Sequence, residues 1–351
     1  MSVLTQRPST RFKAPDGRFA PSPAEDRGTP RDQVRLLVAR PGGVTHARFH
    51  DLPDHLAEGD LVVVNNSATI AGQLDADLLG RGPVVLHLAT PLDDGTWVVE
   101  LRTSPDAKRA VLDARVGDRI RAGAAALQLL EPYPRHSSPT GHGNRLWRAR
   151  ATGPLTHQAA THGRPIAYGY LERAYPLAAY QTVFATHPGS AEMPSAARPF
   201  TPQILTRLVN LGIAVAPITL HTGISSQEAG EAPLPERFRV PASTARLVNA
   251  TRAGGGRVVA VGTTVTRAIE SAVDPDGHLT PAAGWTRRVL TPTDPPQVVT
   301  GLITGWHDPL ASHLLLVESV AGPHLTQRAY DAATAEHYLW HEFGDSTLFL
   351  P

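Results

Sequence analysis

The sequence predicts an α/β protein in which helices cover a mixed sheet and a small β-barrel domain is inserted into the chain. Strand-like and helix-like segments alternate from residue 154 onward, which favours a mostly parallel or mixed sheet. Short strands separated by turn residues dominate residues 73–153, which is typical of a barrel or sandwich. We therefore expect a flexible arm over 1–33, a discontinuous main domain over 34–72 and 154–351, and an inserted barrel domain over 73–153.

The first 33 residues are polar and rich in proline and arginine, which disfavours regular structure before Val34. They lack the apolar core of a secretory signal, and no run of 18 apolar residues occurs anywhere in the chain. The chain has no cysteine, which excludes disulfides and thiolate metal sites. We expect a cytoplasmic protein with no membrane partner.

The main domain should begin with a hairpin. Arg35–Val38 and His46–Phe49 are apolar enough for strands, and Pro41–Gly43 provides the turn between them. Leu61–Val64 is a continuous apolar run, which predicts a strand buried on both faces. The strands expected in the barrel are Gln73–Leu79, Val84–Ala89, Thr96–Arg102, Asp118–Arg121, Ala125–Leu130 and Leu146–Thr152.

The second part of the main domain alternates strands with helices. Thr201 is a typical N-cap, and Pro202 follows it at the first helical position. The expected helices are Thr201–Leu211, Ser243–Ala253, Thr263–Ala272, Leu314–Ala321 and Gln327–Phe343. The expected strands are Ile213–Leu220, Val258–Val261 and Val298–Ile303.

Three of these strands end in residues that can bind a ligand or move a proton. After Val258–Val261 come Gly262, Thr263 and Thr264, and Arg267 follows one turn later. Ligands of open α/β sheets collect at the carboxyl ends of strands, and the free amides of a helix N-terminus favour an anion. The alternative is an ordinary helix that Thr263 or Thr264 caps.

His221 follows the expected strand Ile213–Leu220. Trp306 and His307 follow the expected strand Val298–Ile303. Either histidine could act as a base, and the face of Trp306 could contact a cation. The alternatives are structural histidines and a core tryptophan. Asp345 could bind an amino group or ribose hydroxyls, or cap a turn. No metal is expected, because the His-Glu-x-x-His order of zinc proteases is absent.

Several segments, in one order, resemble the S-adenosylmethionine:tRNA ribosyltransferase-isomerase family from about residue 31 to the end. The matching segments are Arg35–Val38, Gly59–Asn65, Tyr180–Ala185, Thr219–His221, Gly255–Arg257, Val261–Thr264, Arg267–Ala268, Glu270–Ser271, Gly284–Thr286, Leu302–Thr304 with His307, and Phe343–Asp345. The fold of that family, an α/β domain interrupted by a small β-barrel, agrees with the fold expected above.

The resemblance implies an enzyme of queuosine biosynthesis. It would transfer the ribosyl part of S-adenosylmethionine to the aminomethyl group of a deazaguanine in tRNA, isomerise it to an epoxycyclopentane, and release adenine and methionine. His221 and His307 are then the candidate bases. The residues expected to bind S-adenosylmethionine are Tyr180, Thr263, Thr264, Arg267, Trp306 and Asp345. No metal is implied.

The chain departs from the family at polar positions. Asn66, Ala68, Pro199 and Leu310 stand where the family has an acid, an arginine, a histidine and a lysine. The net charge of only +1 also disfavours a large nucleic-acid surface. Two alternatives therefore remain beside the tRNA enzyme: a divergent paralogue that uses S-adenosylmethionine or a related nucleoside on a small-molecule acceptor, and a catalytically inactive binding protein.

Overall fold

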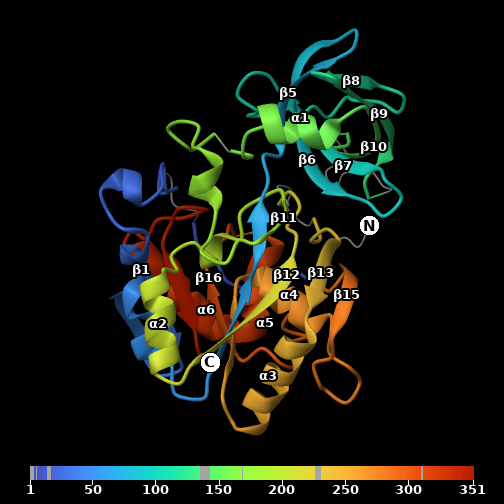
Figure 1. Ribbon diagram of the computed structural model, residues 1–351. Coiled ribbons are helices and arrows are strands. Elements are labelled where there is room, and N and C mark those ends of the chain that lie inside the picture. Colours follow the sequence, from blue (N-terminus) through green and yellow to red (C-terminus); the bar gives the residue numbers. More distant parts are fainter. Residues whose placement is uncertain are drawn as a thin grey trace.

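The computed structural model describes residue 4 and residues 6–13, 17–134, 143–167, 169–225, 231–309 and 311–351. A barrel lies above a larger α/β domain, and β11 (His187–Ser190) lies between the two (Figure 1). β11 pairs in parallel with β4 (Ser67–Thr69), the strand that precedes the barrel in the chain. This arrangement confirms the predicted fold class.

The α/β domain is built on a nine-stranded mixed sheet. In spatial order its strands are β15 (Ala282–Thr286), β13 (Glu236–Val240), β12 (Ala214–Leu220), β3 (Leu61–Asn65), β14 (Val258–Val261), β16 (Gly301–Thr304), β17 (Ser346–Phe349), β1 (Arg35–Arg40) and β2 (Gly43–Arg48). The four central strands β12, β3, β14 and β16 are parallel, and the β1–β2 hairpin is antiparallel as predicted.

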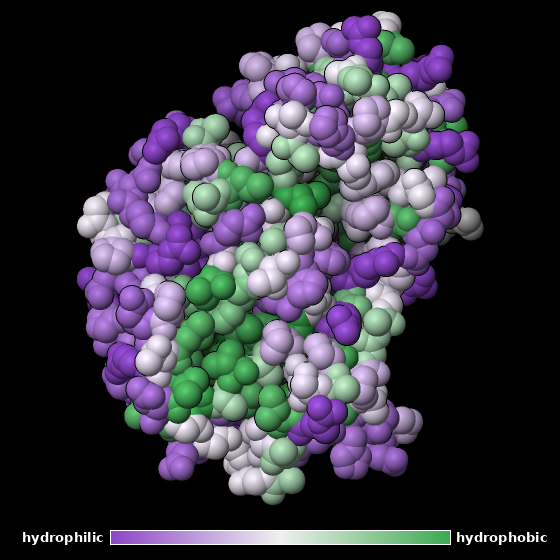
Figure 2. Space-filling model, viewed as in Figure 1, coloured by the Kyte–Doolittle hydropathy of each residue, from purple (hydrophilic) through white to green (hydrophobic). Residues whose placement is uncertain are grey.

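Helices cover both faces of this sheet. One face packs against α3 (Ala242–Ala253), α4 (Thr263–Glu270), α5 (Ser312–Ala321) and α6 (Pro323–Ala335). The other face packs against α2 (Pro202–Asn210) and the 3₁₀ turns of Phe49–His55. Because both faces are covered, every residue of β3 is buried, which explains its continuous apolar sequence. Figure 2 shows an apolar area on the surface of this domain, and exposed Val209, Leu211 and Leu247 belong to or adjoin α2 and α3.

The inserted domain is a closed six-stranded barrel. Its strands, in spatial order, are β10 (Leu146–Thr152), β7 (Trp97–Thr103), β6 (Gly82–Pro91), β5 (Gln73–Leu78), β8 (Arg119–Ala122) and β9 (Ala125–Pro132). Alternate residues of these strands fill the barrel with leucine, valine and alanine side chains. The helix α1 (Leu155–His162) follows the last strand and contributes Leu155 and Ala159 to the same core.

Three local expectations were wrong. Gly262, not Thr263 or Thr264, is the N-cap of α4, and no side chain caps that helix. The last long helix ends at Ala335 instead of continuing to Phe343, because the chain leaves helical geometry and His337 takes a positive φ of 60°. Residues 298 and 299 do not extend β16, because their amides donate to the Glu270 carboxylate at 3.0 and 2.9 Å.

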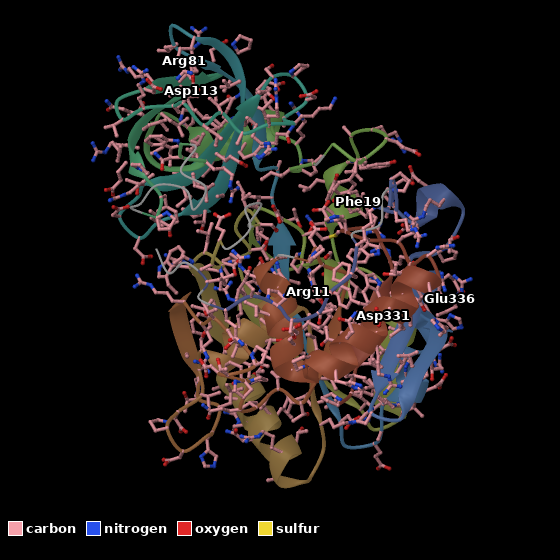
Figure 3. The ribbon with its side chains drawn as sticks, turned by 180° about the vertical axis from the view of Figure 1, so that it is seen from behind. Arg11, Phe19, Arg81, Asp113, Asp331 and Glu336 are labelled. Carbon is pink, nitrogen blue, oxygen red and sulfur yellow. The ribbon has the colours of Figure 1, made fainter. Side chains whose placement is uncertain are left out.

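The described residues before Val34 lie against the α/β domain and not apart from it. Glu318 of α5 accepts hydrogen bonds from the backbone amides of Ser9 and Thr10 at 2.9 and 2.6 Å. Figure 3 shows the same N-terminal chain, marked by Arg11 and Phe19, crossing this side of the domain. The buried carboxylate of Glu318 explains the contact, because it needs hydrogen-bond donors that its own helix cannot provide. Within the described residues, no helix has the length and apolarity to cross a membrane.

Candidate active site

A cavity opens at the carboxyl edge of the parallel strands, where sequence analysis expected a ligand. Its walls come from the chain after β14 and β16, from Glu192–Ala196 after β11, and from Thr222–Ser225 after β12. The turn that carries His341 and Glu342 completes it. These five chain segments, far apart in sequence, thus meet at one place, as ligand sites of open α/β sheets do.

One wall is the N-terminus of α4. Gly262 ends β14 with a positive φ of 95°, a conformation that disfavours any side chain, and the helix starts directly after it. Thr263 and Thr264 therefore line the cavity at a helix start that no side chain caps. The free amides and the positive end of the helix dipole favour an anionic group here.

Arg267, one turn further along α4, is buried and holds a second wall in place. Its guanidinium pairs with the carboxylate of Glu236 and donates to the carbonyls of Leu234 at 2.9 Å and Arg288 at 3.1 Å. Glu236 also accepts the amide of Gly223 at 3.0 Å. Burial raises the pKa of Glu236, and the charge of Arg267 opposes that increase. Arg267 thus joins α4 to the loop that closes the cavity.

The same loop is tied to the barrel at its other end. Arg145 of the barrel donates to both carboxylate oxygens of Glu231, at 3.1 and 3.2 Å, and to Glu100 at 3.3 Å. Glu100 also accepts from Arg102 at 2.8 Å, and all these side chains are buried. The cavity wall between Glu231 and Glu236 is therefore anchored in both domains.

His307 lines the cavity after β16. Its Nε2 lies 2.9 Å from the Thr304 hydroxyl, and its backbone amide donates to the Tyr330 hydroxyl at 3.2 Å. The ring of His313, from α5, stacks on it with centroids 5.0 Å apart. Burial lowers the pKa of His307 well below its usual value, and the nearby histidines lower it further. Burial also lowers the pKa of His313, to about 4, so both rings are neutral at pH 7.

Trp306 is in the cavity wall but is almost wholly buried, at 2% exposure. It packs edge-to-face against Tyr330 and Tyr338, with centroids 5.0 and 5.6 Å apart, and lies beside Trp340. Its main contacts are therefore within the aromatic core, and it supports the wall from behind.

Three of the eight predicted site residues are not in the cavity wall. His221 turns its Nδ1 to the Ser67 hydroxyl at 2.8 Å, next to Ser190. Tyr180 is buried behind the cavity against Phe343. Asp345 accepts the backbone amides of Arg35 at 2.8 Å and Leu339 at 2.7 Å. The structure thus brings together Thr263, Thr264, Arg267, Trp306 and His307 and leaves the other three around them.

Six ionisable residues in the described wall were not among the predicted site residues: Glu192, Glu236, Asp308, His313, His341 and Glu342. Glu192 and Glu342 stand beside segments that were recognised, but an isolated glutamate carries no pattern that predicts its environment. Glu236 begins a strand whose charged and apolar residues alternate, Glu236–Val240, and that alternation indicates a strand with one buried and one exposed face. No group of three or more His, Asp or Glu residues that could hold a metal ion occurs in the described part of the chain.

Leu310, which stands in place of a family lysine, lies outside the residues that the structure describes.

The fold and the cavity define a class of protein, an α/β enzyme whose main domain is interrupted by a barrel and has a cavity at the carboxyl edge of its parallel strands. The sequence matches the family described as "Queuosine biosynthesis protein" over residues 9–349. The chain belongs to that family.

Several curated relatives match the chain under one name, S-adenosylmethionine:tRNA ribosyltransferase-isomerase. The protein of Synechococcus elongatus is 34% identical, and the match covers 97% of this chain and 94% of the relative. The proteins of Symbiobacterium thermophilum and Acidiphilium cryptum are 34% and 35% identical, with 97% and 96% of this chain and 98% and 97% of theirs covered. The chain thus spans nearly the whole length of these relatives.

A crystal structure of S-adenosylmethionine tRNA ribosyltransferase from Thermotoga maritima has the same fold. It is 24% identical, covers 97% of this chain and 99% of its own, and superposes with a TM-score of 0.52. The inserted barrel and the mixed sheet are therefore features that this chain shares with a protein of known structure.

Proposed function

We propose that this enzyme transfers and isomerises the ribosyl part of S-adenosylmethionine onto the aminomethyl-deazaguanine of a tRNA, with release of adenine and methionine. The observation that carries the proposal is the cavity, in which an uncapped helix N-terminus and a neutral histidine face one space. The relatives' name supplies the two substrates. A tRNA substrate also implies that the protein acts in the cytoplasm.

In this proposal the N-terminus of α4 binds the methionine carboxylate. The amides of Thr263 and Thr264 are the donors, and Arg267 keeps the opposite wall in position through Glu236. Asp345 has an indirect role, because its hydrogen bond to Leu339 shapes the turn that brings His341 and Glu342 into the cavity. Tyr180 and Trp306 support the wall from the protein side.

His307 is the proposed base. The positive sulfonium of S-adenosylmethionine acidifies the adjacent C5′ protons, and a neutral imidazole beside it can accept one of them. Collapse of the resulting carbanion opens the ribose and expels adenine, and the tRNA amine then captures the sugar. The bond from sulfur to C5′ breaks when the sugar closes to the epoxycyclopentane, and methionine leaves with the electron pair of that bond. His221 is not in the cavity wall, so we assign it the support of Thr222–Ser225, the chain that follows it.

The test is adenine release from S-adenosylmethionine, with and without tRNA that carries the aminomethyl-deazaguanine. We expect release that depends on this tRNA. The variant His307→Ala should lower the rate by about 100-fold or more, the usual contribution of a general base. His324→Ala is the matched control, because His324 is exposed on α6 away from the cavity, and it should leave the rate unchanged. Release that needs no tRNA, or that needs a small-molecule acceptor instead, would contradict the proposal.

A further inference from the structure

We propose that Glu342, with Glu192 beside it, receives the sulfonium of S-adenosylmethionine, and that Glu342 releases a proton when this cation binds. The inference rests on the proposed function for the identity of the ligand. It adds a residue that selects the charged co-substrate over a thioether analogue that has no charge on sulfur, and it predicts how pH controls binding.

Glu342 has a carboxylate oxygen whose hydrogen-bonding capacity is unmet. Its Oε2 atom is enclosed and forms no hydrogen bond of normal geometry with any residue that the structure describes. Within the same described part, no lysine or arginine forms an ion pair with it. A buried carboxyl oxygen without a partner costs free energy, so its retention in a cavity wall indicates a ligand group as the missing partner.

The carboxylate of Glu192 is held near that of Glu342. Glu192, from the segment after β11, accepts the backbone amide of Ser225 at 2.9 Å and also the Ser225 hydroxyl. These bonds fix its position in the cavity wall. Arg267 is the one arginine among the described residues of the wall, and it is already paired with Glu236. The cavity therefore has more acidic than basic groups, and a cation relieves the repulsion between Glu192 and Glu342.

The cavity wall favours opposite charges at two places. The N-terminus of α4 at Thr263 and Thr264 favours an anion, whereas Glu192 and Glu342 favour a cation. S-adenosylmethionine carries a carboxylate and a sulfonium separated by a short carbon chain. The cavity offers a matching site for each group, so electrostatics alone would orient the ligand in one direction.

The carboxyl group of Glu342 holds a proton before the ligand enters. Burial raises its pKa to about 8, repulsion from Glu192 contributes, and the Tyr170 hydroxyl opposes the increase. The other titratable or charged groups around it, from its own turn and from the elements packed against that turn, are Tyr180, His341, Asp345, His307, Asp308, His313, Glu236 and Arg267.

A cation beside this carboxyl group lowers its pKa, so binding expels the proton. The affinity for the cation should then rise about tenfold for each pH unit up to about pH 8 and level off above it. Glutamine at this position is uncharged at every pH and has the shape of the protonated acid. Glu342→Gln should therefore fold normally and lose this part of the pH dependence.

The experiment is isothermal titration calorimetry with S-adenosylmethionine and with S-adenosylhomocysteine, which lacks the positive charge on sulfur. Each is titrated from about pH 6 to about pH 9, in two buffers of different ionisation enthalpy, so that proton release is measured directly. The proteins are the wild type, Glu342→Gln, and Glu336→Gln as a control. Glu336 is an exposed glutamate at the end of α6, away from the cavity (Figure 3).

We expect the wild type and Glu336→Gln to release close to one proton on binding S-adenosylmethionine at about pH 7, and Glu342→Gln to release about one fewer. The ligand's own ionisations cancel between these proteins. S-adenosylhomocysteine should bind the wild type with no such release. The affinity for S-adenosylmethionine divided by that for S-adenosylhomocysteine should be at least about tenfold smaller in Glu342→Gln than in the wild type. A second variant, Glu192→Gln, should lower the pH at which the affinity levels off, because it removes the repulsion that raises the pKa of Glu342.

Equal proton release by the wild type and Glu342→Gln would overturn the inference, and so would equal release with both ligands. In those cases S-adenosylmethionine still binds, and the proposed function survives. If the wild type binds neither ligand at any pH, the proposed function fails with it, so the two failures can be told apart.

Discussion

The pair formed by Arg267 and Glu236 allows a quantitative test of how the cavity wall is held. Arg267→Met removes the charge and three hydrogen bonds but keeps most of the apolar volume of the side chain. It leaves a buried carboxylate and the carbonyls of Leu234 and Arg288 without their donor. Breaking a buried ion pair in this way costs about 3–5 kcal/mol of unfolding free energy.

The partner substitution should cost less. Glu236→Gln keeps an acceptor for the amide of Gly223, and Arg267 still has two carbonyl acceptors, so we expect a loss of about 1–3 kcal/mol. The double variant contains no buried unpaired carboxylate. It should therefore be more stable than the sum of the two single losses implies, by about 0.5–3 kcal/mol.

Urea unfolding of the four proteins, followed by circular dichroism, measures these differences, provided that the slope against urea is the same for all. Calorimetric titration with S-adenosylmethionine provides a second measurement, because a loosened wall should weaken binding in Arg267→Met more than in the double variant. Strict additivity of the two losses would refute the reasoning, since it would mean that the two side chains do not stabilise each other.

Three more predictions follow from single contacts. Burial alone would raise the pKa of Glu100, but a histidine hydrogen bond and two arginine charges lower it to about 2. Its contribution of roughly 3 kcal/mol to the free energy of unfolding is therefore present above about pH 5 and lost as the pH falls toward 2. Glu100→Gln should flatten the acid side of the stability curve measured by urea unfolding. Gly189→Ala would place its Cβ 2.4 Å from Nδ1 of His221, so the ring must move and the histidine signals in an NMR spectrum should shift. A Cβ at Gly223 has no atom within 4 Å, so Gly223→Ala should leave these signals in place. Glu318→Ala removes the acceptor of the N-terminal segment, so hydrogen exchange at Ser9 and Thr10 should become faster; unchanged protection would show that other contacts hold the segment.

The fold could be predicted to the extent that its elements have a local signature. β3 and β14 are continuous apolar runs, and α2 has both its cap and its first-turn proline, so their bounds agree with the sequence to within a residue or two. β17 is only four residues long, and it was missed. It is a strand because β1 and β16 lie on its two sides, which is a property of the tertiary structure and not of the segment.

The residues of the candidate site could also be predicted only in part. Thr263, Thr264 and His307 could be found because they follow strand ends, and parallel strands bring their carboxyl ends to one edge. His221 also follows a strand end, but its ring turns toward Ser67. The direction in which a side chain leaves the end of a strand depends on the local φ and ψ and on the neighbouring loops, and the sequence pattern contains neither. Glu192 and Glu342 meet only through the folded chain, since 150 positions separate their numbers.

The anchoring of the cavity wall in both domains has a consequence for how the protein can be shortened or recombined. A barrel that served only as an attachment could be deleted or exchanged between relatives without harm to the α/β domain. Here the barrel's Arg145 is bound to Glu231, and Asp93 of the barrel accepts a hydrogen bond from Trp285 of β15 at 2.7 Å and pairs with Arg237 of β13. Removing residues 73–153 would leave the strip from Glu231 to Glu236 fastened at one end only. The two domains therefore have to be inherited, and engineered, as one unit.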